Sequence, residues 1–128
     1  MTLSKKFQQN TGIGVDIIDI SRFTKLNRKK DKLFLSRIFT PSEIKYSFSK
    51  AKPAQHLAAR FAGKEAIVKC LKGLGITAYY KQIEIINDKS GVPKAKLKDK
   101  KLSTKTEILL SLSHCKDKAI AFAIAFKR

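Results

Sequence analysis

Apolar and polar positions alternate or repeat in a way that divides this chain into short strands and helices. Residues 11–20 alternate loosely, and this pattern predicts a first strand that is buried in the fold. The apolar side of that strand comprises Ile13, Val15 and Ile17. Asp16 faces away from Val15, and so it lies on the opposite side of the predicted strand.

Helices are predicted where capping residues precede helical spacing. Ser21 stands before a basic segment that continues through Leu26, and it indicates a helix start. The run Thr40-Pro41-Ser42-Glu43 combines an N-cap threonine, a proline at the first helical position and a glutamate that closes a capping box. Residues 54–71 are rich in alanine, repeat their large apolar residues at helical spacing, and form the longest predicted helix.

Two hairpins follow this helix in the predicted order of elements. Residues 83–86 and 92–97 form the first hairpin, and the turn between them contains the asparagine and glycine typical of turns. Residues 98–106 are basic and irregular or weakly helical. Residues 108–114 and 118–126 alternate and form the second hairpin. Because tight turns join antiparallel strands, the fold class is α+β, an antiparallel sheet packed with a long helix.

The last predicted strand has two unequal faces. Ile120, Phe122, Ile124 and Phe126 lie on one face, and four alanines lie on the other. Side chains as small as alanine leave room for a close neighbour, so this face predicts packing against a helix or another subunit.

Length and composition limit the organisation of the molecule. The 128 residues, 43% of them apolar, suffice for one domain spanning residues 1–128. The polar and basic segment 1–10 lacks the apolar region of a signal peptide, and no run is apolar enough for a membrane span. Cys70 and Cys115 form no C-x-x-C pair, which indicates reduced thiols. We therefore expect a cytoplasmic protein without membrane contact.

A net charge of +18, from 28 Lys and Arg against 10 Asp and Glu, indicates a polyanionic partner. A nucleic acid, an acidic protein and a phosphorylated small molecule all satisfy this condition. Lysine outnumbers arginine, which disfavours the bidentate reading of bases. The alternative function that charge supports, in particular through the basic run 98–105, is a nucleic-acid-binding protein.

Cysteine and histidine chemistry is excluded by spacing. His56 and Cys70 lie fourteen residues apart on one predicted helix, or roughly 21 Å, and cannot touch. His114 and Cys115 are neighbours, and neighbours on a strand point to opposite faces. Two histidines and two cysteines at unrelated spacings also give no zinc site.

The carboxylates Asp16 and Glu65 remain as candidates for chemistry. Taken alone, Asp16 could cap the element that follows its strand, and Glu65 could pair with Lys69 four residues later on the helix. Together with flanking cations, the two carboxylates could instead hold Mg²⁺ beside a ligand with several phosphates. Arg60 and Lys64 share one helix face, and Lys69 projects about 180° from Arg60. The cations could equally be a solvated helix face.

Four motifs together resemble holo-acyl-carrier-protein synthase, the small bacterial type of 4′-phosphopantetheinyl transferase. They are Gly14-Val15-Asp16, the signature from Phe61 to Lys69 with its central Lys64-Glu65-Ala66, the turn from Asn87 through Gly91 to Pro93, and Ser111 to His114. Any one motif is weak, but all four occur in the family's order over nearly the whole chain. Gly63 and Cys115 depart from the residues usual in the family.

The resemblance implies a 4′-phosphopantetheinyl transferase fold and the transfer of phosphopantetheine from coenzyme A to a serine of apo acyl carrier protein, with release of 3′,5′-ADP, for fatty acid biosynthesis. It implies that Asp16 and Glu65 bind Mg²⁺ and that Lys69 stabilises phosphate charge. The base is left open between Glu65 and a water held by the metal carboxylates. The residues implied around coenzyme A are Arg60, Lys64, Asn87, Gly91, Pro93, Ser113 and His114.

The resemblance also gives the positive charge a partner, because acyl carrier proteins are acidic. Arg22 corresponds to a family contact, and Lys25, Arg28 and Arg37 extend that surface. Nucleic acid is then not expected as a partner. Family members are homotrimers with the active site between subunits, and the alanine face of residues 119–125 would suit such packing.

Overall fold

A computed structural model describes residues 2–128, except for the side chain of Leu3. The strands, the helix capped by Thr40 and the long helix follow the predicted order, and the structure adds two helices that were not predicted, Leu3–Gln9 and Lys32–Ile38. In chain order the elements are α1 (Leu3–Gln9), β1 (Thr11–Asp19), the 3₁₀ turn η1 (Ile20–Phe23), α2 (Lys32–Ile38), α3 (Pro41–Phe48), α4 (Pro53–Gly73), the 3₁₀ turn η2 (Tyr80–Gln82), β2 (Ile83–Asn87), β3 (Pro93–Leu97), α5 (Lys100–Lys105), β4 (Thr106–His114) and β5 (Lys118–Lys127).

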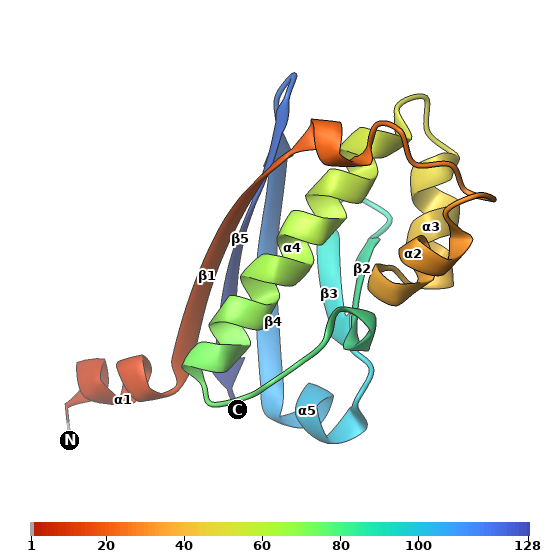
Figure 1. The fold of residues 1–128 in the computed structure, drawn as a ribbon. Helices are drawn as coiled ribbons and strands as arrows, with labels where there is room; N and C mark the ends of the chain where they lie inside the picture. Colours follow the sequence, from red (N-terminus) through yellow and green to blue (C-terminus); the bar gives the residue numbers. More distant parts are fainter. Residues whose placement is uncertain (1) are drawn as a thin grey trace.

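The strands form two antiparallel sheets that share the long helix as a cover. The larger sheet has the order β1-β5-β4, so the first and last strands of the chain pair, and β2 and β3 form a separate hairpin. Figure 1 shows α4 lying across one face of the larger sheet, with α2 and α3 beside its N-terminal half. The α+β class and the long helix predicted from the sequence are confirmed.

Two glycines let β1 lie directly on the backbone of α4. A Cβ atom on Gly12 would stand 1.9 Å from the carbonyl oxygen of Cys70, and one on Gly14 would stand 1.9 Å from that of Ala66. No other residue fits at this distance without a backbone shift. The close approach carries Asp16, two residues after Gly14, to the side of the helix.

The alanine face of β5 packs inside this chain, so the prediction that it suits subunit packing is wrong and the prediction of a helix against it is confirmed. Ala119, Ala121, Ala123 and Ala125 are buried in the core that the sheet forms with α4. Their small side chains allow the helix to approach the sheet.

The opposite face of the sheet carries the larger side chains and is exposed. The prediction of a buried first strand is therefore wrong for its apolar side, because Ile13 is 68% exposed and Ile17 is 62% exposed. Val15 pairs with Phe122 across β1 and β5, and both are about half exposed. This outer face is an apolar surface that one copy of the chain leaves uncovered.

The helix predicted after Ser21 is reduced to η1. Beyond Phe23 the chain makes a loop in which Asn27 Oδ1 accepts hydrogen bonds from the amides of Lys29 and Lys30. An asparagine that bonds nearby backbone groups competes with the helix, and the successive cations there repel one another. Ser21 precedes only this short turn.

Two further helices differ from or refine the sequence prediction. Thr40 and Glu43 form the predicted capping box at the start of α3. The short α1 was not predicted, because segment 1–10 reads only as polar and basic; its Phe7 ring lies 6.2 Å from that of Phe126. Within residues 2–128, no helix has the length and apolarity needed to cross a membrane.

Candidate functional site

Asp16 and Lys69 meet at the junction of β1 and α4. The Lys69 ammonium donates to the carbonyl oxygen of Val15 at 2.8 Å and to Asp16 Oδ1 at 3.3 Å. The Asp16 side chain is 19% exposed and that of Lys69 is 52% exposed. The distance is long for a charged hydrogen bond, so this ion pair is weak and both groups remain accessible to a ligand.

Glu65 lies one helical turn before Lys69 on α4 and has a partner from another element. The Tyr80 hydroxyl donates to Glu65 Oε1. This hydrogen bond is the main cause that raises the pKa of Tyr80 to about 12, with burial and the charges of Glu65 and Asp16 adding to it. The Asp16 charge is therefore near enough to act on the same tyrosine. Two carboxylates, one from β1 and one from α4, thus lie around Tyr80 and Lys69.

The donor set of this site fits a hard divalent cation that also binds phosphate. Mg²⁺ in proteins commonly takes one or two carboxylates and completes its coordination with phosphate oxygens and water. Among residues 2–128 no group of three or more His, Cys, Asp or Glu residues has the geometry of a metal site. Two carboxylates on neighbouring elements, Asp16 and Glu65, fit the part of such a coordination sphere that a protein supplies.

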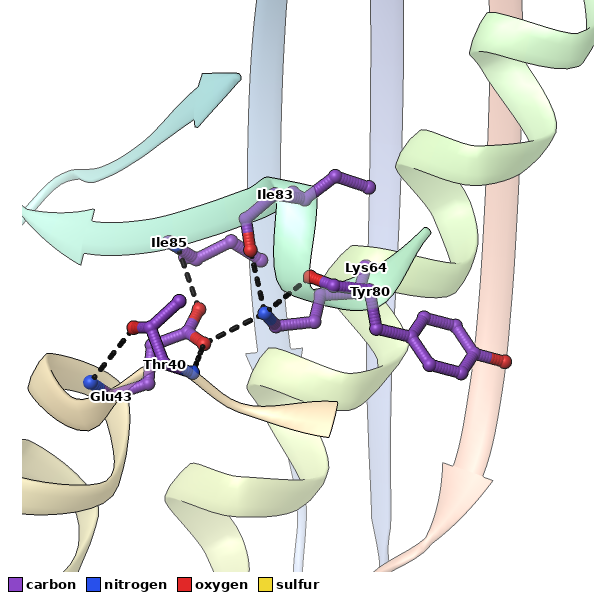
Figure 2. A network of polar contacts seen from close by, with 6 residues as sticks. All are labelled: Thr40, Glu43, Lys64, Tyr80, Ile83 and Ile85. Atoms are coloured by element: carbon purple, nitrogen blue, oxygen red, sulfur yellow. Dashed lines mark hydrogen bonds and ion pairs between the residues drawn. The ribbon is translucent and has the colours of Figure 1, made fainter. Parts of the chain in front are cut away.

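A second acid–base pair, Glu43 with Lys64, is fully buried between α3 and α4. Lys64 Nζ lies 2.7 Å from Glu43 Oε1, and both side chains are 0% exposed. The ammonium also donates to the carbonyl oxygens of Tyr80 at 2.9 Å and Ile83 at 2.6 Å. Figure 2 shows these contacts, with the Tyr80 ring pointing away from the pair. Three acceptors use all three N–H groups of the lysine.

Both carboxylate oxygens of Glu43 have hydrogen-bond partners, as all three N–H groups of Lys64 do. Its Oε1 also accepts the Thr40 amide at 2.8 Å, as the capping box requires, and its Oε2 accepts the Ile85 amide at 2.8 Å (Figure 2). Burial lowers the pKa of Lys64, and the adjacent Glu43 carboxylate opposes that effect. The pair joins α3, α4 and β2.

This geometry bears on the sequence prediction that Lys64 contacts coenzyme A. A phosphate would reach the ammonium only if one of its three present acceptors moved away. The phosphate contact of Lys64 stays a prediction, and the structure gives the side chain other partners.

Arg60 and Asn87 are brought together with Tyr46, a residue that the sequence analysis did not single out. The Arg60 guanidinium lies 4.1 Å from the centroid of the Tyr46 ring, and Asn87 Nδ2 donates to the Tyr46 hydroxyl at 2.9 Å. These residues line a recess of about 150 Å³ together with Ser42, Ile85 and Ile86. Arg60 is only 3% exposed, and its Nε atom has no hydrogen-bond partner.

An unpaired, buried guanidinium nitrogen is costly and indicates an acceptor that the protein itself does not supply. Burial lowers the pKa of Arg60, although the group stays charged at any ordinary pH. Arg60 therefore gives the recess a positive charge.

His114 belongs to the same region as Arg60. The pKa of His56 is lowered, first by burial and then by the charges of Arg60, Lys50 and His114. The His56 ring meets the Tyr46 ring edge-on, with centroids 5.6 Å apart. His114 ends β4 and is exposed, so its imidazole can reach a ligand bound beside α4.

The remaining predicted contacts lie in the β2–β3 turn and at Ser113. Gly91 and Ser113 are exposed, and Pro93 is half-buried. Gly91 has φ of 86°, the conformation that favours glycine, and the turn is closed by Asp88, which accepts from the Ser90 and Val92 amides. Pro93 starts β3 opposite Asn87. Asn87 thereby connects this turn to the Arg60 recess.

The four basic residues predicted to bind a partner are all exposed. Arg22 lies over the Phe61 ring at 5.4 Å from its centroid, and Lys25 and Arg37 are solvated. Arg28 lines a recess of about 510 Å³ with two lysines and an apolar floor. The recess residues are Arg28, Lys29, Lys32, Leu35, Ser36, Pro41 and Ile44.

Sequence reasoning missed Tyr80, Tyr46 and Glu43. Glu43 was recognised only as a helix cap, and its second task depends on α4 and β2, which are distant in sequence. Nothing in the local pattern distinguishes Tyr80 from its neighbour Tyr79. Of these three residues, only Glu43 had a sequence signal, its place in the capping box.

Comparison with known proteins identifies the family. Residues 12–123 match the model of the 4′-phosphopantetheinyl transferase superfamily. The chain is similar to the holo-[acyl-carrier-protein] synthase of Thermodesulfovibrio yellowstonii, with 44% identity over 114 residues that cover 88% of this chain and 96% of the other.

Solved structures agree with this comparison. The holo-[acyl-carrier-protein] synthase of Neisseria meningitidis matches with a TM-score of 0.73 and 33% identity, over 91% of this chain and 98% of that one. The Helicobacter pylori enzyme, solved in complex with coenzyme A, matches with a TM-score of 0.71 and 32% identity, over 91% of this chain and 99% of that one.

Proposed function

Since this chain belongs to the 4′-phosphopantetheinyl transferase superfamily, we propose that it transfers the 4′-phosphopantetheine group of coenzyme A to a serine of an apo acyl carrier protein. The observation that carries the proposal is 44% identity, over 88% of the chain, to a holo-[acyl-carrier-protein] synthase. The accessible carboxylates Asp16 and Glu65 support it. The whole of residues 1–128 then acts as one transferase domain in fatty acid biosynthesis, and the cytoplasmic location expected from the cysteines stays a prediction.

In the proposed reaction the hydroxyl oxygen of the carrier serine attacks the β-phosphate of coenzyme A. A phosphorus–oxygen bond forms to serine, the bond from that phosphorus to the bridging oxygen breaks, and 3′,5′-ADP leaves with the electron pair. The serine proton passes to a base. Catalysis of this kind depends on alignment and on stabilising charge over phosphate oxygens.

Asp16 and Glu65 would hold Mg²⁺, which when bound supplies a Lewis acid and a template for the phosphate oxygens. The structure supports this role through the position of the two carboxylates on facing elements and through their exposure to a ligand. Lys69 would turn its ammonium from Asp16 to the phosphate as the reaction proceeds, because its hydrogen bond to Asp16 is long. The base that accepts the serine proton would be Glu65 itself or a water held by the two metal carboxylates.

The nucleotide end of coenzyme A would extend along α4 toward its N-terminal half. Arg60 offers an unpaired nitrogen there, Asn87 lines the same recess, and the His114 charge acts on His56 beside it. Gly91, Pro93 and Ser113 would form the outer contacts. A phosphate bound at Arg60 would satisfy a donor that is otherwise buried without a partner.

The carrier protein would dock on the basic side of the molecule. Arg22, Lys25, Arg28 and Arg37 give this side its charge, and the recess beside Arg28 adds an apolar floor from Leu35 and Ile44. An acidic helix with an apolar residue on the same face would complement both features. Rim charges of this kind raise the association rate more than the affinity.

A homotrimer stays part of the proposal, with its interface moved from the alanine face to the outer face of the sheet. This face carries an apolar patch that is exposed to water in a single copy of the chain. The patch consists of Ile13, Val15, Ile17 and Phe122. Substituting Val15→Lys should lower the assembly state measured by light scattering. A wild-type protein that is monomeric at micromolar concentration would overturn this part alone.

The deciding experiment incubates the protein with apo acyl carrier protein, coenzyme A and Mg²⁺, and follows the mass of the carrier. The expected result is a gain of one phosphopantetheine group, which a chelator of divalent cations prevents. An unchanged carrier mass in the presence of all three components would overturn the proposed function. Binding of RNA or DNA that falls steeply with salt would then favour the alternative.

A further inference from the structure

We propose that Tyr80 is a positioning residue that fixes the Glu65 carboxylate, and that the buried Glu43–Lys64 pair holds Tyr80 in place for this task. The inference rests on the proposed function, since it concerns the same site. It names a residue outside all four motifs that carry the family resemblance.

The contact between Tyr80 and Glu65 is the first step. Glu65 has a long side chain with several rotamers and is only partly buried, so α4 alone does not fix its carboxylate. The Tyr80 hydroxyl donates to Oε1 and leaves Oε2 free to face a cation. Carboxylates that bind metals are commonly held by such outer hydrogen bonds, and loss of the outer partner weakens metal binding.

The Tyr80 ring is itself held on one side by aromatic neighbours. Its centroid lies 5.4 Å from that of Phe61, which in turn lies 5.7 Å from that of Phe23. Phe23 is 4% exposed and belongs to the core. These contacts set the direction of the ring, but they do not fix the backbone that carries it.

The backbone of Tyr80 is fixed by Lys64. Tyr80 opens η2, a turn of three residues, and its carbonyl accepts from the Lys64 ammonium, as does the carbonyl of Ile83 directly after the turn. One buried ammonium therefore binds both ends of η2 (Figure 2). Lys64 immediately precedes Glu65 on α4, so adjacent helix residues bind the backbone and the hydroxyl of the same tyrosine.

The chemistry of the buried pair favours a positioning role over one in stability alone. Moving two charges out of water costs several kcal/mol. A pair of apolar residues of similar volume often stabilises a protein at least as much as a buried ion pair does. What apolar residues cannot do is hold two carbonyls in a set direction. Three N–H groups on one atom do this, because Glu43 fixes the ammonium from the other side.

The test compares Tyr80→Phe with Tyr79→Phe. The control removes the same hydroxyl from the neighbouring residue, which is 70% exposed. The first readout is Mn²⁺ binding to the protein in the presence of coenzyme A and the absence of carrier. The electron paramagnetic resonance signal of free Mn²⁺ measures this binding. The second is the Mg²⁺ concentration that gives half the maximal rate of transfer.

Tyr80→Phe should weaken metal affinity about 10–100-fold in both measurements. Its KM for the carrier and its melting temperature should stay near those of the wild type, and Tyr79→Phe should match the wild type throughout. Wild-type metal affinity in Tyr80→Phe would overturn the inference. An inactive wild-type protein would instead overturn the proposed function, so the two failures are distinguishable.

The role of the buried pair is tested by combining variants. If Lys64 acts through Tyr80, Lys64→Met should weaken Mn²⁺ binding in the wild-type background and have little further effect in Tyr80→Phe. Where Lys64→Met does not fold, Glu43→Gln replaces it, because the amide keeps an acceptor for Ile85 and removes the charge beside Lys64. Additive losses in the double variant would show that Lys64 acts independently of Tyr80.

Discussion

Two lysines of α4, five residues apart, pair with acids in opposite surroundings. Lys64 and Glu43 are both 0% exposed, 2.7 Å apart, and every donor of the lysine is used. Lys69 and Asp16 are 3.3 Å apart, and Lys69 is half exposed. Both lysines belong to the one signature of the sequence, yet the first is bound on all sides and the second is accessible to a ligand.

The difference shows that one helix can carry both a structural ion pair and an ion pair that is available for catalysis. The buried pair gains strength from the low dielectric around it but cannot exchange partners without exposing an unpaired charge. The accessible pair is weak in water, so a phosphate or a cation can replace either partner at small cost. A reaction that needs its charged groups to change partners is therefore better served by Asp16 and Lys69.

The largest expected effect comes from removing a carboxylate of the accessible site. Asp16→Ala and Glu65→Ala should each lower the rate of carrier modification by about 10²–10³-fold or more, because each removes a group that stabilises charge at the phosphates. The free energy of unfolding should change by about 1 kcal/mol or less, since the Asp16–Lys69 ion pair is weak and the loss of Glu65 removes one hydrogen bond. Mass spectrometry of the carrier and urea unfolding measure the two quantities.

The matched control for these variants is Glu107→Ala, which removes an exposed carboxylate of β4. It should leave the rate unchanged. A near wild-type rate in Asp16→Ala or Glu65→Ala would contradict the metal assignment.

The next effect distinguishes the two lysines, because substituting Lys64 should mainly lower stability and substituting Lys69 should mainly slow transfer. Lys64→Met should cost about 3–5 kcal/mol of unfolding free energy, because it leaves Glu43 charged and buried without its partner. Lys69→Met should cost about 1 kcal/mol or less but should slow transfer about 10²–10³-fold. Urea unfolding and single-turnover kinetics measure these losses. Equal losses of stability in the two variants would abolish the distinction between a buried and an accessible pair.

A smaller effect is expected where β1 touches α4. Gly14→Ala places a methyl group 1.9 Å from the Ala66 carbonyl oxygen, so the strand must move and Asp16 with it. We expect a loss of about 1–3 kcal/mol of stability and a slower transfer. In Gly73→Ala the new methyl group meets its nearest atom at 3.6 Å, an ordinary contact, and the change should be neutral or stabilising by up to about 1 kcal/mol. If both variants unfold at the same denaturant concentration, the close approach does not constrain Asp16.

The smallest effect does not concern function. It tests whether β1 protects the side of α4 that carries Cys70 from solvent. Cys70 follows Lys69 but is buried, and burial raises the pKa of its thiol to about 11, whereas Cys115 is exposed. At pH 8 a thiol reagent should modify Cys115 alone in the folded protein and both thiols in urea. Rapid modification of Cys70 in the folded state would indicate that β1 does not stay on the helix.

Much of the fold was predictable because its signals are local. The capping box at Thr40, the alanine-rich run of α4 and the alternation of β5 each depend on neighbouring residues. The failures also have local causes: Asn27 bonds its own loop and ends the helix expected after Ser21. The exposure of Ile13 and Ile17 was not predictable, because alternation gives two faces and does not say which one a helix covers.

The candidate site was predictable only in its motif residues. Asp16, Glu65 and Lys69 follow from the resemblance, and the structure places them at one junction. Tyr80 and Tyr46 carry no signal, because their roles depend on contacts with α4 across 15 and 14 residues of chain, and a sequence pattern records spacing rather than contact.

By itself the sequence determined the order of the strands, the position of the long helix, the α+β class, the family and the excess of positive charge, since these depend on residue types and their spacing. The tertiary structure alone decided which lysine of the signature is buried, which face of the sheet α4 covers, and which tyrosine meets Glu65. The physical reason is that burial and pairing are set by neighbours distant in the chain. The dielectric environment they create makes one ion pair fixed and leaves the other exchangeable.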